Sequence, residues 1–125
     1  MARNRPGRYG DKILKYKHDG HTFDSKRELA RYGELQLLQK GNAIRFLEVH
    51  PKFKIIIAGV PIKYITKRGD RQMTYTADFK YEERQADGSY KTVIEDVKMQ
   101  SGYRTEVYKI KRALMKAMGN EIREV

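Results

Sequence analysis

The chain has 125 residues, of which 39% are hydrophobic and 34% charged, a balance that suits one compact globular domain. It carries 27 lysines and arginines against 16 aspartates and glutamates, and the formal net charge of +11 favours a polyanionic partner, with nucleic acid as the leading candidate. The absence of cysteine excludes disulfides, cysteine-based zinc sites and a thiol nucleophile.

An anionic membrane surface is the competing explanation for the positive charge. However, no apolar run approaches the roughly 20 residues needed to span a bilayer. Residues 1–6 also lack the apolar core of a signal peptide. We therefore expect a cytoplasmic protein without a membrane partner.

The first twelve residues mix Arg3, Arg5 and Arg8 with proline and glycine and show no apolar periodicity. This composition predicts a flexible basic arm over residues 1–12, followed by a single domain over residues 13–125. Two interpretations of the arm have equal support. It is either simple terminal disorder or a segment that contacts phosphates of nucleic acid.

Residues 13–23 predict a small hairpin around a turn at 18–20, followed by the first long helix from about Lys26 to Gln39. Ser25 is the expected N-cap, and Gly41 is expected to end the helix in a left-handed conformation. Four residues are predicted to mark the buried side and three the solvent side. They are Leu29, Tyr32, Gly33 and Leu37 on the buried side, and Arg27, Arg31 and Glu34 on the solvent side.

Glu28 shares a stripe with Tyr32 and Leu35, so we expect it at the edge of the buried face. Ser25 and Glu28 also match a capping box, in which the glutamate bonds back to the backbone at the helix start. Helix chemistry alone leaves a capping role and a functional carboxylate equally open.

The middle of the chain is rich in strand-forming residues punctuated by glycine and proline. The predicted strands are 44–49, 53–57, 62–66, 72–81 and 90–98. A second helix is predicted from near Thr105 to Gly119, and the tail 121–125 is expected to add a short edge strand. The predicted core stripe of this second helix is Val107, Ile110, Leu114 and Ala117. A separate basic stripe consists of Lys109, Arg112 and Lys116. A charged stripe on a helix is usually a solvated face, but here it suggests contact with a phosphate backbone.

Two of the predicted strands bring a pair of acids together. A three-residue turn with Gly88 at positive φ pairs Gln85 with Ser89, and counting back from there sets Asp78 opposite Asp96. Facing carboxylates repel each other, and a shared divalent cation would remove that penalty.

The period of two along the last strand puts Asp96 and Lys98 on one face and Glu95 on the other, so Asp96 is the expected partner of Lys98. A pair of solvated strands carrying a simple Asp96–Lys98 ion pair has equal support from the pattern alone.

Because Asp78, Asp96 and Lys98 occur in this order along the chain, the chain resembles the PD-(D/E)xK, or restriction-endonuclease-like, nuclease superfamily. Within it the chain is similar to a small phage-encoded group of endonucleases and Holliday junction resolvases. The segments that carry the resemblance are 20–28, 44–47, 50–53, 75–81, 95–98 and 108–111. The element order predicts an α/β domain with a central mixed sheet flanked by two helices, and the resemblance implies an αβββαβ core.

The resemblance also implies a role for each candidate residue. Asp78 and Asp96, helped by the Val97 carbonyl and by Glu28, would bind Mg²⁺ or Mn²⁺, and Lys98 would orient a water or neutralise charge on the phosphate. The resemblance thereby favours a functional role for Glu28 over a capping role. The three histidines, His18, His21 and His50, are scattered in sequence and are interpreted as turn or surface residues rather than ligands.

We therefore expect a metal-dependent DNA endonuclease, selective for branched DNA such as Holliday junctions, that acts in phage recombination or DNA processing within a bacterial host. A non-catalytic nucleic-acid-binding module on the same fold is the main alternative. A structural assembly protein would leave both the acid pair and the basic stripe unexplained. The sequence leaves a homodimer open.

Overall fold

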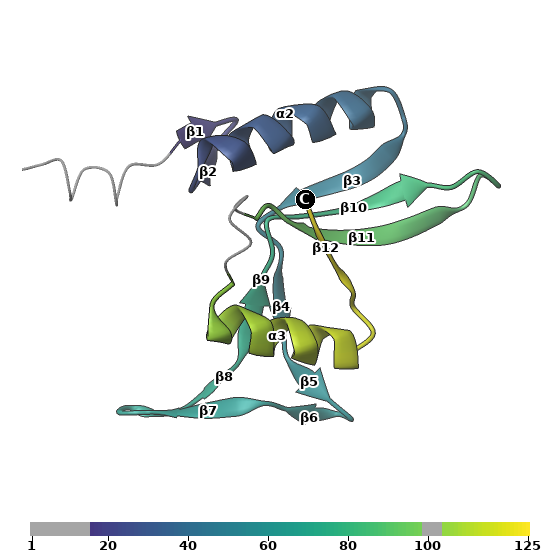
Figure 1. The fold of residues 1–125 in the computed structure, drawn as a ribbon. Helices are drawn as coiled ribbons and strands as arrows, with labels where there is room; N and C mark the ends of the chain where they lie inside the picture. The colour runs from purple at the N-terminus through teal and green to yellow at the C-terminus, as the bar shows by residue number, and fades with distance from the viewer. Residues whose placement is uncertain (1–15, 99–103) are drawn as a thin grey trace, which may run out of the picture.

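The computed structural model describes residues 16–98 and 104–125 (Figure 1). The proposed basic arm with Arg3, Arg5 and Arg8 lies outside these residues. The elements in chain order are β1 (Tyr16–His18), β2 (His21–Phe23), α2 (Lys26–Lys40), β3 (Ile44–Val49), β4 (Lys52–Lys54), β5 (Ile56–Ile57), β6 (Val60–Pro61), β7 (Lys63–Thr66), β8 (Gly69–Gln72), β9 (Thr74–Thr76), β10 (Phe79–Arg84), β11 (Tyr90–Asp96), α3 (Glu106–Ala117) and β12 (Ile122–Glu124).

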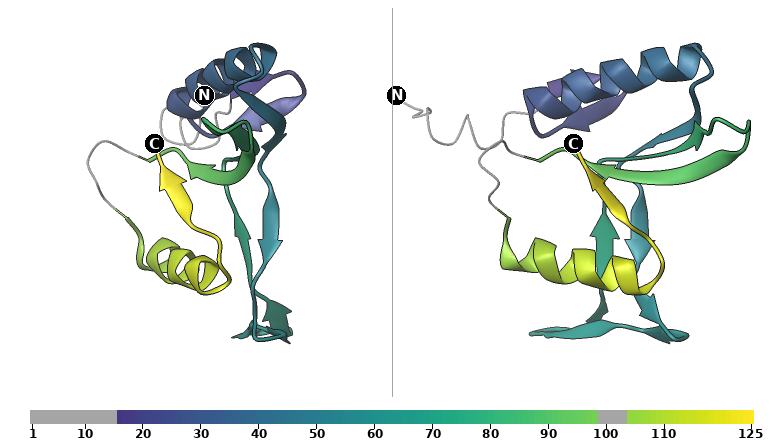
Figure 2. Two further views of the ribbon diagram at one scale, coloured as in Figure 1. Left: turned by 90° about the vertical axis from the view of Figure 1, so that its right-hand side faces the viewer. Right: turned by 45° about the vertical axis from the view of Figure 1, so that its right-hand side comes forward.

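A mixed four-stranded sheet with the order β12-β11-β10-β3 forms the centre of the structure. Strand β10 runs antiparallel to β11 and β3, while the edge strand β12 runs parallel to β11. Helix α2 packs on the face that carries Val93, and α3 packs on the face that carries Ile94 (Figure 2). The predicted α/β class, with a mixed sheet and two flanking helices, is confirmed at this level. Among the described residues, neither helix is long and apolar enough to cross a membrane.

The chain bends sharply where β3 leads into β4 and β9 leads into β10 (Figure 1). His50 takes a positive φ of 54° at this point, and its amide donates to the Asp78 carbonyl at 2.9 Å. The Ala77 amide donates to the Pro51 carbonyl at 3.0 Å, so both bends are tied together. The expected single strand over 72–81 is therefore wrong, because β8, β9 and β10 are separate elements.

The bend divides the buried residues into two cores. The α2 core contains Phe23, Tyr32, Leu35, Ile44, Phe79, Tyr81 and Val93, and the α3 core contains Ile55, Tyr75, Ala77, Ile94, Met115 and Ile122. Tyr75 and Phe79 would share one face of a straight strand, and both are buried, but in different cores. A regular strand alternates between two faces only while it stays straight.

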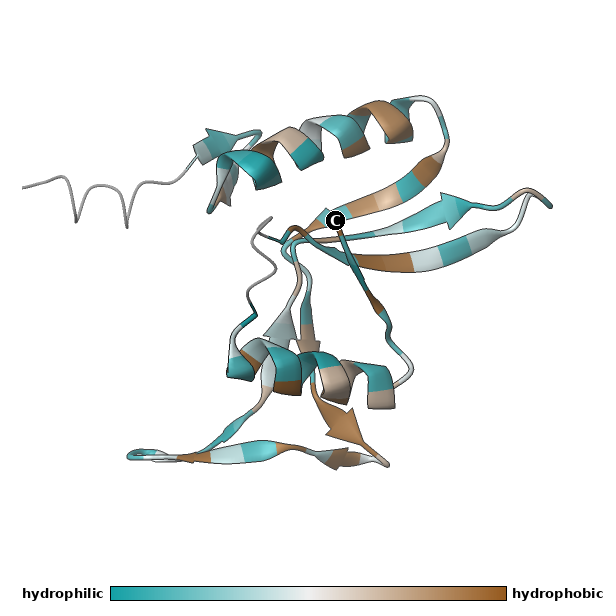
Figure 3. Cartoon of the chain, viewed as in Figure 1, coloured by the Kyte–Doolittle hydropathy of each residue, from teal (hydrophilic) through white to brown (hydrophobic). Residues whose placement is uncertain are grey.

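Beyond the bend, β5 to β8 form short hairpins at the far end of the molecule. The Gln72 side chain holds their junction by donating to the carbonyls of Ile55, Ile62 and Met73 at 3.0–3.1 Å. The expected strand 53–57 is divided at this junction into β4 and β5. Strand β6 was not predicted. Hydrophobic residues, brown in Figure 3, occur in these hairpins, and Ile56, Val60 and Ile65 are exposed.

The β10–β11 hairpin has the predicted register. Arg84 faces Tyr90 and Phe79 faces Glu95, and the Gln85 amide donates to the Ser89 carbonyl at 2.7 Å. Gly88 has a φ of 88°, as the turn requires.

Helix α2 begins as predicted, because the Ser25 hydroxyl accepts the Glu28 amide at 3.1 Å. Its end differs. Gly41 has a φ of −85°, and Asn42, at a φ of 65°, takes the left-handed conformation that asparagine tolerates. The prediction that Leu37 is buried is also wrong, since its exposed fraction is 71%. The buried residues of α2 are Glu28, Tyr32 and Leu35, and Leu37 points about 200° away from Leu35 around the helix.

Helix α3 begins after Thr105, whose hydroxyl accepts the Tyr108 amide. Its predicted core stripe is only partly correct, because Leu114 packs against the α3 core but Val107 and Ile110 do not. Val107 and Ile110 are 63% and 55% exposed, and Met115 is the buried residue of the helix. The contact face is therefore rotated by about one residue, or 100°, toward Tyr108 and Met115.

Arg31, predicted on the solvent side, instead ties α2 to the sheet. Its Nε and Nη2 atoms each lie 2.8 Å from the Glu95 carboxylate, and the Glu95 side chain is fully buried. The Tyr81 hydroxyl donates to the same carboxylate. Arg31 also contacts Glu34, whose side chain is 63% exposed.

Removing this buried ion pair should destabilise the fold. Arg31→Met leaves the Glu95 carboxylate buried and uncompensated, so we expect a loss of about 3–5 kcal/mol in the free energy of unfolding. The matched control is Glu34→Gln, which removes only the exposed partner and should cost less than about 0.5 kcal/mol. Urea unfolding followed by circular dichroism measures both, and equal losses would contradict the assignment.

Candidate metal centre

The candidate site lies at the bend, where three elements of the sheet end or begin. Asp96 is the last residue of β11, Asp78 immediately precedes β10, and His50 immediately follows β3. Glu28 reaches the same place from the first turn of α2. The site thus combines residues that are up to 68 positions apart in sequence, since Glu28 and Asp96 are its first and last members.

Asp78 and Asp96 accept hydrogen bonds from each other's strand. The Asp78 amide donates to Asp96 Oδ1 at 2.9 Å, and the Val97 amide donates to Asp78 Oδ2 at 2.7 Å. In each carboxylate, one oxygen accepts a backbone N–H, and this hydrogen bond orients the group. This exchange confirms that the two acids face each other, as the register predicts, and it reduces their repulsion by placing N–H dipoles between them.

Glu28 and His50 complete a cluster with Asp78. One potential ligand atom from each of the three residues lies within 4.8 Å of those of the other two. Glu28 Oε1 is buried without a hydrogen-bond partner and lies 3.6 Å from His50 Nε2. A buried carboxylate oxygen without a hydrogen bond is rare in folded proteins, and here it faces two other potential ligands.

Burial raises the pKa of all three carboxyl groups at the site. The pKa of Glu28 rises to about 7, chiefly because of burial and secondly because of the nearby negative charge of Asp78. Burial also raises the pKa of Asp78 and of Asp96, against the opposing effects of the Val97 amide on Asp78 and of the Lys98 ammonium on Asp96. A bound cation would reduce the unfavourable energy of these clustered negative charges.

Lys98 lies beside the acids, as predicted. Its Nζ is 3.6 Å from Asp96 Oδ2 and 3.6 Å from the centre of the Tyr108 ring. Glu95 lies on the other face of β11 with Arg31, so Asp96 is confirmed as the partner of the lysine.

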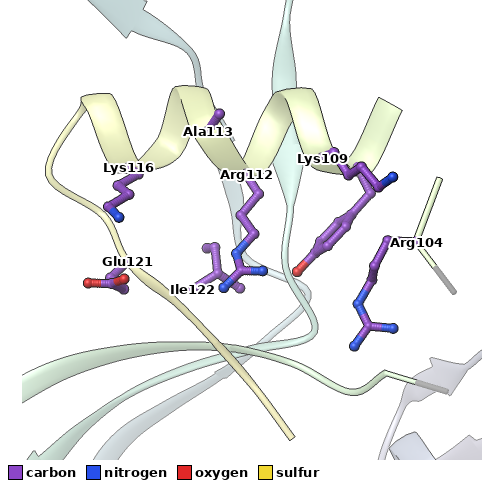
Figure 4. A pocket seen from close by; sticks show the side chains of 8 residues that line it. Arg104, Lys109, Arg112, Ala113, Lys116, Glu121 and Ile122 are labelled. Atoms are coloured by element: carbon purple, nitrogen blue, oxygen red, sulfur yellow. The ribbon is translucent and has the colours of Figure 1, made fainter. Parts of the chain in front are cut away.

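The three residues of the basic stripe all line one cavity of about 250 Å³ between α3 and β12 (Figure 4). Arg104 adds a fourth cation to its lining. Arg112 and Arg104 both bind the Glu124 carboxylate, while Lys109 pairs with the exposed Glu106. Sequence periodicity grouped Lys109, Arg112 and Lys116 correctly but gave no sign of the cavity.

Three residues near the site were not found by sequence reasoning. His50 was interpreted as a turn or surface residue, and Tyr108 and Glu124 had no assigned role. The only sequence signal for His50 is its position directly after the strand that pairs with β10. Tyr108 and Glu124 reach the site through packing of α3 and β12, which the sequence pattern does not specify.

Comparison with known protein families shows one match. The model of a family described as "Protein of unknown function (DUF1064)" matches residues 7–125. The chain belongs to this family. No curated protein and no solved structure matches the chain. The function of this DUF1064 protein is therefore inferred from the geometry of the site itself.

The raised pKa of Glu28 predicts a pH dependence of stability in metal-free protein. The folded carboxyl titrates at about 7, whereas the ordinary pKa is 4.5. Between these values the folded state binds more protons than the unfolded chain, so the free energy of unfolding falls as pH rises from about 4.5 to about 7.

Glu28→Gln cannot titrate and should make this fall smaller by roughly 2 kcal/mol. Urea unfolding in EDTA at a series of pH values measures the difference. The same pH dependence in both proteins would show that Glu28 titrates normally.

Proposed function

We propose that this protein is a metal-dependent DNA endonuclease of the restriction-endonuclease-like type. The observation that carries the proposal is the cluster at the bend of the sheet, where the buried Glu28 and Asp96 and the half-buried Asp78 lie near Lys98. A protein that only binds nucleic acid gains nothing from several carboxylates beside a polyanion. An enzyme that hydrolyses phosphodiesters uses them to hold a cation.

The donor set fits a divalent cation. Glu28 Oε1 is buried without a hydrogen bond, and Glu28, Asp78 and His50 each offer a ligand atom within 4.8 Å of the other two. One oxygen of Asp78 is already oriented by the Val97 amide, which limits the positions of the other. These three residues, with Asp96 and the Val97 carbonyl as further candidates, would hold Mg²⁺ or Mn²⁺.

The residues around the cluster suit hydrolysis of a phosphodiester. When bound, a divalent cation supplies Lewis acidity to the phosphate and to water. The Lys98 ammonium, held beside Asp96, orients the attacking water or stabilises negative charge that grows on the phosphate. The backbone amides of Asp78 and Val97 keep the two aspartates in place, so little reorganisation is needed.

The distribution of positive charge supports DNA as the substrate. The net charge is +11, although the centre of the candidate site is acidic. Lys109, Arg112 and Lys116 line the cavity on α3, close to the strand that carries Asp96. Cations on a helix beside an acidic site hold the phosphates that flank the cleaved bond. The arm with Arg3, Arg5 and Arg8 is proposed to contact a second backbone segment.

The resemblance to phage resolvases refines the proposal toward branched DNA. We propose that the substrate includes four-way or flapped junctions formed during phage recombination in the host cytoplasm. A homodimer would bring two sites to one junction. A panel of linear, flapped and four-way DNA, assayed with Mg²⁺ or Mn²⁺ and with EDTA, tests substrate choice and metal dependence together. Full cleavage in excess EDTA would disprove the mechanism.

Substitutions at the site should separate metal binding from turnover. Asp78→Asn and Asp96→Asn should abolish cleavage and weaken metal binding while the fold persists, and DNA binding should not weaken, because a negative charge facing phosphate is lost. Lys98→Ala should keep metal binding and lose cleavage by about 10²–10⁴-fold.

The control for these variants is Asp70→Asn, an exposed acid in β8 that should change neither property. Cleavage rates, calorimetric metal titration and circular dichroism report the three effects. Wild-type cleavage by Asp78→Asn would remove that residue from the mechanism.

His50 provides a test of metal choice that does not depend on activity. An imidazole nitrogen binds first-row transition ions well and Mg²⁺ poorly. His50→Asn should therefore weaken Mn²⁺ binding by about tenfold or more and change Mg²⁺ binding little. The matched control is His18→Asn, a half-exposed histidine in β1. Calorimetric titration with both ions measures the effect, and equal losses for Mn²⁺ and Mg²⁺ would exclude His50 as a nitrogen ligand.

A further inference from the structure

The Lys98 side chain lies between an acid and an aromatic ring. Its Nζ is 3.6 Å from Asp96 Oδ2 and 3.6 Å from the centre of the Tyr108 ring, and the side chain is 22% exposed. The negative face of an aromatic ring attracts an ammonium group without neutralising it by proton transfer. Tyr108 thus offers Lys98 a second contact that holds the ammonium beside Asp96 and limits its range of positions.

Tyr108 is itself held in place by a network at the other end of its ring. Its hydroxyl donates to Glu124 Oε2 at 2.7 Å, and Glu124 is bound by Arg104 at 3.0 Å and by Arg112 at 3.2 Å. Hydrogen bonds from Arg104 and then from Tyr108 lower the pKa of Glu124 to about 2. The carboxylate therefore stays charged and keeps its partners across the neutral pH range.

The backbone links this network to the site as well. Strand β12 pairs with β11 so that Glu124 lies opposite Asp96. The Lys98 amide donates to the Val125 carbonyl, and the Val125 amide donates to the Asp96 carbonyl, both at 2.9 Å. The ring of Tyr108 and the backbone of Lys98 are thus anchored to the same strand, which sets where the ammonium meets the ring.

We propose that Tyr108 is a positioning residue that holds the Lys98 ammonium for catalysis. The inference rests on the proposed nuclease function, in which Lys98 acts on the phosphate or the attacking water. Arg112 lies in the basic cavity and also binds Glu124, so the surface proposed to hold DNA is connected to the lysine through Glu124 and Tyr108. Tyr108 also lines this cavity, but the role proposed for it is exerted through Lys98.

The first test measures the contact itself and needs no cleavage. A proton above an aromatic ring experiences a ring-current shift, so the Lys98 ε-methylene signal should lie upfield in the NMR spectrum, with Lys98→Arg identifying it. Tyr108→Phe keeps the ring and should keep the shift, whereas Tyr108→Leu should remove it. An unshifted signal in the folded wild-type protein would overturn the proposal.

The second test measures turnover. Tyr108→Leu should lower kcat about tenfold with little change in KM or in metal affinity, and Tyr108→Phe should restore kcat to within about threefold of wild type. Phenylalanines with increasing numbers of ring fluorines at position 108 should lower kcat stepwise, because fluorine weakens the attraction of the ring for a cation at nearly constant size. A purely structural role would follow ring size and leave this series flat.

The control for the fluorine series is position 75. Tyr75 belongs to the α3 core, and its ring centre is 6.4 Å from that of Tyr108. The same series there should leave kcat unchanged. In a Lys98→Ala background, the Tyr108 substitutions should have no further effect on residual cleavage.

The outcomes separate this proposal from the function on which it rests. If the wild-type protein cuts none of the DNA panel, the proposed nuclease function fails, and the NMR shift still reports whether Tyr108 holds Lys98. If the protein cuts DNA and the shift is present but the fluorine series is flat, the positioning role is overturned while the nuclease function stands.

Discussion

Two backbone-to-carboxylate hydrogen bonds, from the Asp78 amide to Asp96 and from the Val97 amide to Asp78, fix the geometry of the whole site. Each carboxylate accepts an amide from the opposite strand, one from Asp78 and the other from Val97. These bonds occur where β10 begins and β11 ends, so the register of the hairpin determines the position of both acids. A shift of register by one residue would place the two side chains on opposite faces of the hairpin and remove the cluster.

The sheet keeps two groups of buried charge apart by using both of its faces. Glu95 points toward α2, where Arg31 and Tyr81 satisfy its carboxylate completely. Asp96, the next residue, points the other way and meets Lys98. A fully paired acid stabilises the docking of a helix, whereas incompletely paired acids with raised pKa values are available for binding. Adjacent residues of one strand thus serve structure and the candidate site separately.

The bend of the sheet brings in the remaining parts. His50 takes a positive φ there and donates its amide to the Asp78 carbonyl, which turns its ring toward Glu28. On the other side, β12 and α3 bring Glu124 and Tyr108 beside Lys98. The acidic centre therefore lies between α2 on one side and the basic cavity of α3 on the other, an arrangement suited to a bound phosphate backbone beside a cation.

The local features of this protein could be predicted from the order of its residues. Turn chemistry at Gly88 and a period of two predicted the β10–β11 register and the pairing of Asp96 with Lys98, because both depend only on residues close in the chain. The α2 stripe through Glu28, Tyr32 and Leu35 was also predicted, because helical spacing is local.

Packing between distant segments selects the helix faces that meet the sheet and the residues that join the site. Val107 and Ile110 fit an apolar stripe yet are exposed, since α3 docks through the neighbouring face, with Met115 buried. His50 enters the cluster because two strands bend at the same point, and Arg31 finds Glu95 only when α2 lies over the sheet. Periodicity reports the amphipathic character of a segment, but the partner that covers each face is set by packing among elements far apart in sequence.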